Sequence, residues 1–330
     1  MTTPVDEQAG VDREEYSRTA FGLALSIDQR ISIPGLGHNP ASVAADLPSR
    51  IHLDPAALNQ RWDTVTATPF RARELRFGET LLMSVDFAEP AGYLLWARDF
   101  GRVLISIDGM ELLCDPDPAV EDWANILAFQ ALPLAATIRG LEVLHASGVV
   151  LDGRAILLAG PPGAGKSSLA AALVRAGGQL LSDDAVALEL SDGALIAHPG
   201  STALQLRSAE NQRLSAKERA MLGHTIGSVA DKQRYVSAST PEPVALGSVF
   251  LLERSDDEPA VERIAAVDPF ELIASTFNLS VRTPARLLRQ LDVVSTIADR
   301  GLAHRLRVQS SIDATQLASI IKAHLGVAIS

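Results

Sequence analysis

One segment, from residue 155 to residue 184, constrains the fold of this chain more than any other. Gly160 to Ser167 reads GPPGAGKS and matches the pattern G-x-x-x-x-G-K-[ST]. The apolar run Ile156 to Leu158 suits a buried strand before it, and Ser168 to Ala176 has helical composition after it. The order strand, glycine-rich loop and helix predicts an α/β fold whose loop binds a nucleotide.

The residue types of this Walker A loop, or P-loop, each have a chemical reason. Glycines let backbone N–H groups turn toward phosphate oxygens at a helix N-terminus. Lys166 is expected to bridge the outer phosphates, and the Ser167 hydroxyl to ligate magnesium. A turn that merely joins a strand to a helix is the alternative, which the complete motif disfavours. The expected nucleotide-binding residues are Gly160, Pro161, Pro162, Gly163, Ala164, Gly165, Lys166, Ser167 and Ser168.

A pair of acids follows the loop. Gln179 to Leu181 is predicted to return as a second strand that delivers Asp183 and Asp184 to the phosphate end of the sheet. A carboxylate there can hold magnesium or accept a proton from an attacking hydroxyl. The alternative is that the two aspartates only cap a turn, and it weakens once the phosphate loop is considered.

Three strings together carry a family resemblance: LHASGV from Leu144, the loop GPPGAGKS, and LLSDD from Leu180. They resemble the catalytic domain of HPr kinase/phosphorylase, and more closely the HPr-kinase-like serine kinases found beside peptide-modification genes, including lasso-peptide clusters. The resemblance is strong over about residues 140–190 and looser toward the C-terminus. It implies Asp184 as the general base, His145 and Lys166 at the transferred phosphate, and Ser167 and Asp183 as magnesium ligands, with ATP as the donor.

Some residues depart from that family. Ser168 stands where the bifunctional enzymes carry a Glu, and no Glu-Ile-Arg-Gly-Leu-Gly-type string follows the acid pair. Phosphorylase activity, and HPr itself as the acceptor, therefore do not follow from the resemblance. Lys232, Arg207 and Arg234 are candidates for holding phosphate or an acidic substrate, and a solvated charged loop is the alternative for them.

The rest of the chain is predicted to surround this catalytic unit. Residues 1–117 are expected to form a smaller, mostly β N-terminal domain that recognises a substrate or partner, because short alternating segments are separated by turn residues. His38 and His52 lack spaced metal partners, which favours structural roles. Residues 118–139 are predicted as a connecting helix, or as two helices that meet near Pro133, and residues 140–330 as the HPr-kinase-type P-loop domain, a mixed sheet with helices. Within that domain, residues 141–150 are predicted as one strand and residues 227–234 as a mobile loop. A broad apolar stripe from Leu287 to Ile297 is expected to face its core.

Composition narrows the class further. With 330 residues, 47% hydrophobic and 21% charged, the chain is typical of a globular protein large enough for two domains. A net charge of −11 argues against a nucleic-acid or anionic-membrane surface. The acidic first fifteen residues lack the apolar core of a signal peptide, so we expect the cytoplasm. Cys114 is the single cysteine, which excludes an intrachain disulfide.

These features predict an ATP- and magnesium-dependent kinase that phosphorylates a hydroxyl, with a Ser of a peptide or small protein as the favoured acceptor. Two alternatives stay open: a kinase for a small metabolite, and a nucleotide-binding regulator or assembly protein without phosphotransfer. The loop and acids do not name the acceptor or exclude nucleotides other than ATP. They also leave homo-oligomerisation open.

Overall fold

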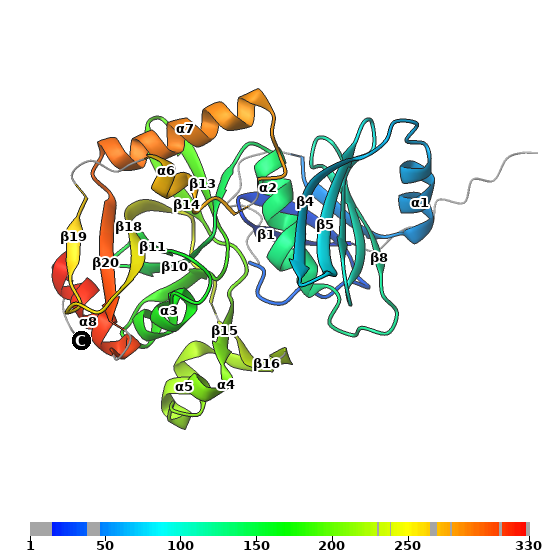
Figure 1. The fold of residues 1–330 in the computed structure, drawn as a ribbon. Coiled ribbons are helices and arrows are strands. Elements are labelled where there is room, and N and C mark those ends of the chain that lie inside the picture. The colour runs from blue at the N-terminus through cyan, green and yellow to red at the C-terminus, as the bar shows by residue number, and fades with distance from the viewer. Residues whose placement is uncertain are drawn as a thin grey trace, which may run out of the picture.

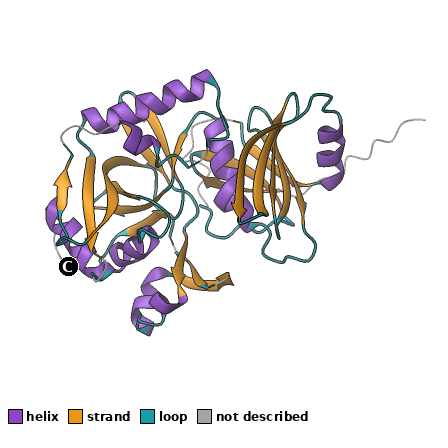
Figure 2. Ribbon diagram, viewed as in Figure 1, coloured by secondary structure: helices purple, strands orange, loops and turns teal. Residues whose placement is uncertain are grey.

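The computed structural model describes residues 15–37, 47–229, 231–237, 239–264, 269–277, 279–309 and 312–327; His38 lies outside these ranges. The described chain forms two lobes that lie side by side (Figure 1). We call residues 15–116 the N-terminal lobe and residues 142–327 the C-terminal lobe. The first is mostly strand, and the second combines strands with helices (Figure 2).

Within the described residues, the N-terminal lobe is an eight-stranded sheet in the order β1-β2-β3-β8-β7-β6-β5-β4. Neighbouring strands are antiparallel, except that β3 is parallel to both β2 and β8. Helix α1 (Pro55–Asp63) begins after Asp54, whose carboxylate accepts the Ala57 N–H at 2.9 Å. The strands are β1 (Glu15–Ala20), β2 (Leu23–Asp28), β3 (Ser49–Leu53), β4 (Phe70–Phe77), β5 (Thr80–Ala88), β6 (Gly92–Ala97), β7 (Gly101–Ile105) and β8 (Glu111–Pro116).

A buried helical segment connects the lobes. The π-helical turn η2 (Leu127–Ala131) leads directly into α2 (Leu132–Ile138), next to Pro133, where the sequence predicts that two helices meet. Helical structure begins only at Asn125, later than the expected start near Pro118. Among the helices described, none combines the length and the apolar character needed to cross a membrane.

The C-terminal lobe is organised on a nine-stranded sheet with the path β12-β10-β11-β18-β14-β13-β9, and β20 and β19 extend it from β18. The pairs β11–β18 and β18–β20 are parallel and the others antiparallel, so the sheet is mixed as predicted. Its strands are β9 (Glu142–Leu144), β10 (Ala146–Leu151), β11 (Arg154–Ala159), β12 (Gln179–Ser182), β13 (Val186–Ser191), β14 (Ala194–His198), β18 (Val244–Ser255), β19 (Val261–Arg263) and β20 (Ala303–Gln309).

Helices cover both faces of this sheet. Side chains alternate along β11, so successive residues of this strand belong to the cores on opposite faces. Ile156 and Leu158 join the core under α3 (Lys166–Arg175) and α8 (Ala314–Leu325). Leu157 joins the opposite core, under α6 (Pro269–Ile273) and α7 (Pro284–Asp299). The phosphate loop therefore follows a strand that is buried on both sides.

A small sheet and two short helices project beside this core. The order is β15-β17-β16, with β15 (Ala203–Arg207), β16 (His224–Val229) and β17 (Lys232–Val236), and α4 (Ser208–Asn211) and α5 (Ala216–Leu222) lie between β15 and β16. The sequence predicts a mobile loop over residues 227–234, whereas the structure has a hairpin there. Strand β17 of this hairpin also pairs with β15, which is too distant in the sequence for the local pattern to predict the pairing.

The apolar stripe of α7 is another correction. Three of its leucines are 44%, 63% and 48% exposed: Leu287, Leu288 and Leu291. The inward positions of the first turns belong to Arg286 and Gln290, because Arg286 Nη2 donates to the buried Glu142 at 2.8 Å. Only the second half of the stripe, around Val293 and Ile297, faces the core.

Candidate functional site

The loop between β11 and α3 leaves backbone donors at a helix N-terminus. Gly163 and Gly165 have φ angles of +81° and +101°, which side-chain-bearing residues rarely adopt. Gly165 is the residue before the first turn of α3, and no side chain caps that turn. The N–H groups that begin α3 are thus left for an anionic ligand.

Lys166 is folded back on the loop that precedes it. Its Nζ donates to the Gly160 carbonyl at 2.8 Å and to the Pro161 carbonyl at 3.3 Å. Burial lowers the Lys166 pKa, the charges of Asp184 and Asp183 oppose that shift, and the charge of Lys232 adds to it. Lys232 on β17 therefore lies within electrostatic range of the loop, although its side chain is exposed.

Asp183 is the buried member of the acid pair, with 4% exposure. Its Oδ1 accepts from the Ser147 hydroxyl at 2.6 Å and from the Ser167 hydroxyl at 2.9 Å, and its Oδ2 accepts the Gln205 N–H at 3.2 Å. Burial raises the Asp183 pKa, and these hydrogen bonds oppose the shift. The carboxylate is thus fixed against the last residue of the phosphate loop.

Asp184 is the open member, with a side chain 41% exposed and a φ angle of +72°. His145 Nδ1 lies 3.0 Å from the Asp184 carbonyl oxygen and 3.4 Å from its Oδ1. Burial lowers the His145 pKa, while the Asp184 charge opposes that shift. A neutral His145 with the proton on Nδ1 would donate to the Asp184 carbonyl and hold the acid in place.

His145 occupies a break in what the sequence predicts as one strand over residues 141–150. β9 ends at Leu144 and pairs with β13, whereas β10 starts at Ala146 and pairs with β11 and β12. The His145 N–H donates to the Ser275 carbonyl at 2.6 Å. The strand changes partners at the residue that meets Asp184.

The remaining basic candidates, Arg207 and Arg234, lie in different environments. Arg207 lines a cavity beside the phosphate loop. Arg234 is only 1% exposed, and its Nη2 donates to Asp122 at 2.6 Å, so it is not part of a solvated loop. This pairing favours a structural role for Arg234.

The cavity beside the loop measures about 420 Å³. Its walls include Gly165 and Ser168 from the loop and the first turn of α3, Arg254 from β18, and apolar side chains such as Leu252 and Val308. Ser168 donates to Glu210 on α4 at 2.6 Å across one wall. The mixture of apolar walls and polar groups suits the nucleoside part of a nucleotide whose phosphates lie on the loop.

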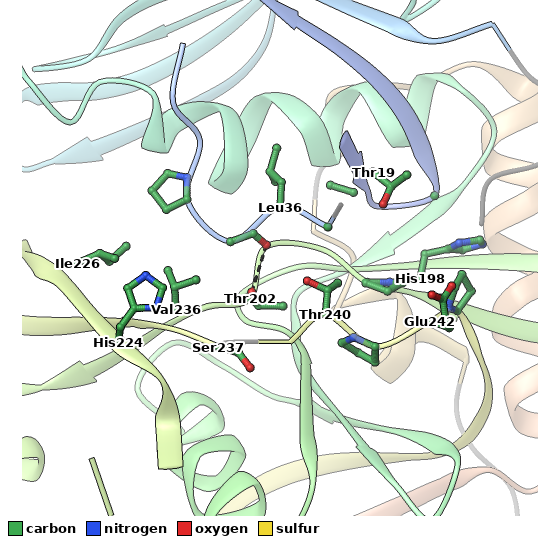
Figure 3. Close-up of a pocket in the computed structure, with 18 of the residues that line it drawn as sticks. Thr19, Leu36, His198, Thr202, His224, Ile226, Val236, Ser237, Thr240 and Glu242 are labelled. Atoms are coloured by element: carbon green, nitrogen blue, oxygen red, sulfur yellow. Dashed lines mark hydrogen bonds between the residues drawn. The ribbon is translucent and has the colours of Figure 1, made fainter. Parts of the chain in front are cut away.

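A larger cavity of about 700 Å³ lies between the lobes (Figure 3). Thr19 and Leu36 line it from the N-terminal lobe, and His224 and Ser237 line it from the C-terminal lobe. The Thr202 hydroxyl donates to the Gly35 carbonyl across it at 3.2 Å. His145, Lys166 and the two aspartates do not line this cavity, so it is separate from the candidate catalytic residues.

Sequence reasoning missed two residues at the site. Ser147 lies two positions after His145 in the string LHASGV, and that position is the signal the sequence offers for it. In the structure its hydroxyl donates to Asp183. Arg73 comes from the N-terminal lobe. Burial lowers the Arg73 pKa, and the charge of Asp184 opposes that shift. No sequence pattern links residue 73 to residue 184.

Comparison with known proteins gives little beyond this geometry. No family model matches the chain, and no curated protein matches it. Among solved structures, the HPr(Ser) kinase/phosphatase from Coxiella burnetii is similar to 56% of this chain and 96% of its own, with 14% identity and a TM-score of 0.30.

Proposed function

We propose that this protein is an ATP- and magnesium-dependent kinase that phosphorylates a hydroxyl, with a Ser of a peptide or small protein as the acceptor. One observation carries the proposal. The buried Asp183 is hydrogen-bonded to Ser167 of the phosphate loop, and the open Asp184 beside it acts electrostatically on Lys166. A phosphate loop with two acids in different environments has the parts that phosphoryl transfer requires.

The donor side is formed by the loop and α3. The uncapped N-terminus of α3 and the N–H groups of the loop would take the phosphates of ATP. Lys166 would exchange the carbonyl oxygens of Gly160 and Pro161 for phosphate oxygens. The cavity of about 420 Å³ alongside has room for the nucleoside.

The residues beside the loop fit magnesium. The ion prefers oxygen ligands and keeps several waters, so one hydroxyl and one carboxylate suffice when phosphates supply the rest. Ser167 and Asp183 offer that pair, with 2.9 Å between Ser167 Oγ and Asp183 Oδ1. The described residues contain no group of three or more His, Cys, Asp or Glu that could hold a metal. When bound, the ion would offset charge on the phosphates.

In the transfer step, the acceptor hydroxyl oxygen forms a bond to the γ-phosphorus as the bond to the β–γ bridging oxygen breaks. ADP leaves with the electron pair, and the hydroxyl proton passes to Asp184. His145 holds the Asp184 backbone through the contact at 3.0 Å. Lys166 stabilises the charge on the transferred group.

The test is transfer from γ-labelled ATP to a panel of Ser peptides, HPr and common metabolites. Asp184→Asn should lower kcat for transfer by about 10²- to 10⁴-fold with little change in ATP binding, because it removes the base. Lys166→Ala should lower both transfer and binding. Asp299→Asn and Lys217→Ala, at exposed positions, are the matched controls and should behave like wild type.

The other outcomes separate the alternatives. Label on a metabolite and on no peptide would replace the peptide acceptor by a small molecule. Tight binding of magnesium-ATP with no transfer, together with an Asp184→Asn variant that keeps its biological activity, would contradict the kinase and favour a regulator.

A further inference from the structure

Arg73 is a half-buried cationic residue of the N-terminal lobe that lies within electrostatic range of Asp184. It lies on β4, the edge strand of the eight-stranded sheet. Its Nη1 atom is buried and, within the described part of the chain, has no hydrogen-bond partner. A buried donor without a partner costs free energy, so this atom has a hydrogen bond that a ligand or a water molecule would satisfy.

Packing and one hydrogen bond hold β4 against the C-terminal lobe independently of the Arg73 side chain. Ala72 is 5% exposed and belongs to the same continuous core as Ala185, the residue after Asp184. The same core includes Phe277, whose ring centroid lies 6.1 Å from that of His145. On the C-terminal lobe, Arg282 Nη2 donates to the Ala72 carbonyl at 3.5 Å.

The other arginines of β4 differ from Arg73. Arg71 pairs with Asp86, and Arg76 Nε lies 3.1 Å from a Glu74 carboxylate oxygen. Both side chains are exposed, at 44% and 46%. Among the described residues, Arg73 has no ion pair at contact distance, and the charge that acts on its pKa is that of Asp184.

Asp184 lies within electrostatic range of Lys166 from the phosphate loop and of Arg73 from the other lobe. Lys166 and Lys232 are on the phosphate-loop side, where ATP would bind. Arg73 belongs to the N-terminal lobe, so an acceptor held between that lobe and Asp184 would meet its guanidinium. A guanidinium there matches a carboxylate in shape and charge, and would let an anionic acceptor approach two aspartates in a protein of net charge −11.

We propose that Arg73 is an acceptor-binding residue: its guanidinium binds a carboxylate of the acceptor that lies next to the hydroxyl to be phosphorylated. The N-terminal lobe thus selects acidic acceptors through one residue of β4. This inference rests on the proposed kinase function and specifies the acceptor side of the same site.

The experiment compares wild type, Arg73→Gln and Arg76→Gln in the full chain. Arg76→Gln makes the same change in charge on the same strand, at an exposed position. The acceptors are pairs of single-Ser peptides that differ only by Asp or Asn beside the Ser. Wild type and Arg76→Gln should prefer the acidic peptide by about 10- to 100-fold in kcat/KM, the range of one hydrogen bond to a charged group. Arg73→Gln should show a ratio near one.

Two results overturn the inference while leaving the kinase intact. One is a wild type with no preference for the acidic peptide, and the other is an Arg73→Gln variant equally slow on both peptides. Arg73→Lys guards against a folding defect, because it keeps the charge and should keep part of the preference.

Binding of O-phospho-L-serine tests the residue without turnover. The complex of the protein with magnesium-ADP is titrated with this probe by calorimetry, with serine as the comparison. Arg73→Gln should bind the probe about 10-fold or more weakly than wild type and Arg76→Gln. Equal binding by Arg73→Gln, or no binding by wild type, would contradict the inference even if the peptide panel yields no transfer.

Discussion

At the scale of single residues, the acid pair illustrates how environment assigns roles to identical side chains. Asp183 is 4% exposed and accepts three hydrogen bonds, whereas the Asp184 side chain is 41% exposed. Asp183 directly follows β12 and its carboxylate is fixed against the loop, whereas Asp184 has a left-handed backbone conformation and a carboxylate open to solvent. Separate environments for two carboxylates are how sites assign distinct chemical roles.

Asp183→Asn should weaken magnesium binding in the nucleotide complex by about 10-fold or more, because the variant keeps the shape but loses the charge. Titration of magnesium against a fluorescent ADP analogue measures this. Since burial raises the Asp183 pKa, wild-type affinity should fall as the pH is lowered toward that pKa, because the protonated acid binds the ion less well. In Asp183→Asn this pH dependence should disappear.

The control for this change is Asp299→Asn, which alters an exposed carboxylate at the end of α7. It should leave both the affinity and its pH dependence as in wild type. If Asp183→Asn binds magnesium as wild type does, Asp183 is not a ligand, and its hydrogen bonds to Ser147 and Ser167 are purely structural.

Local sequence could predict those site residues that a motif carries, and the rest depend on long-range contacts. The loop glycines, Lys166 and the acid pair lie within one segment, so their meeting follows from a strand, a helix and a returning strand. Arg73 reaches Asp184 only because two lobes pack together, and nothing local records that. The sequence predicts that Arg234 either holds phosphate or an acidic substrate or lies in a solvated loop, but pairing with Asp122 from another part of the chain buries it.

At the scale of elements, the order of strand, loop and helix follows from composition, but strand partners do not. The run over residues 141–150 has one pattern and two sets of partners, so the break at His145 is set by β13 on one side and by β11 and β12 on the other. The hairpin β16–β17 likewise depends on a distant partner, because β17 pairs with β15. In α7 a long-range contact overrides the local apolar pattern. An ion pair from this helix to Glu142 takes the inward position and displaces its leucines from the core.

Gly165→Ala tests whether the shape of the phosphate loop, an element-scale property, controls nucleotide binding. Gly165 has a φ angle of +101°, and a Cβ there would meet nothing within 4 Å. The cost is therefore backbone strain, about 1–2 kcal/mol, without a clash. Relief of that strain would turn the N–H groups of the loop, so nucleotide affinity should fall about 10-fold or more.

Gly153→Ala is the matched control. Gly153 lies in the turn between β10 and β11 with a φ angle of +71°, and it also has open space around the added Cβ. Its loss of thermal stability should be similar, with nucleotide affinity unchanged. Equal affinities for the two variants in a fluorescent-nucleotide titration would show that the loop conformation does not set binding.

At the scale of the whole molecule, the two lobes share one apolar core. Phe21, in the turn between β1 and β2, is 1% exposed and donates its N–H to the Pro199 carbonyl at 2.6 Å. Its ring packs so closely on Gly200 that a Cβ at that glycine would lie 2.4 Å from it. The same core contains Ile51 of the N-terminal sheet and Val143 of the C-terminal sheet. A continuous core predicts that the lobes unfold together.

The tryptophans allow this cooperativity to be measured. Trp62, Trp96 and Trp123 all lie in the N-terminal lobe or in the segment that follows it, so their fluorescence reports that half of the molecule. Binding of a fluorescent nucleotide reports the phosphate loop in the other half. In urea, both signals should be lost at the same midpoint in the wild type, because separating the lobes would expose their common core.

Phe21→Ala should move both midpoints down together, by about 3–5 kcal/mol in the free energy of unfolding, since it removes a buried aromatic ring from the junction. Phe77→Ala, at a position 80% exposed on β4, should change stability by no more than about 0.5 kcal/mol. Two separate transitions in the wild type, or a Phe21→Ala variant that shifts only the tryptophan signal, would mean that the lobes are independent. The position of Arg73 beside Asp184 would then depend on how the lobes dock, instead of being fixed by a common core.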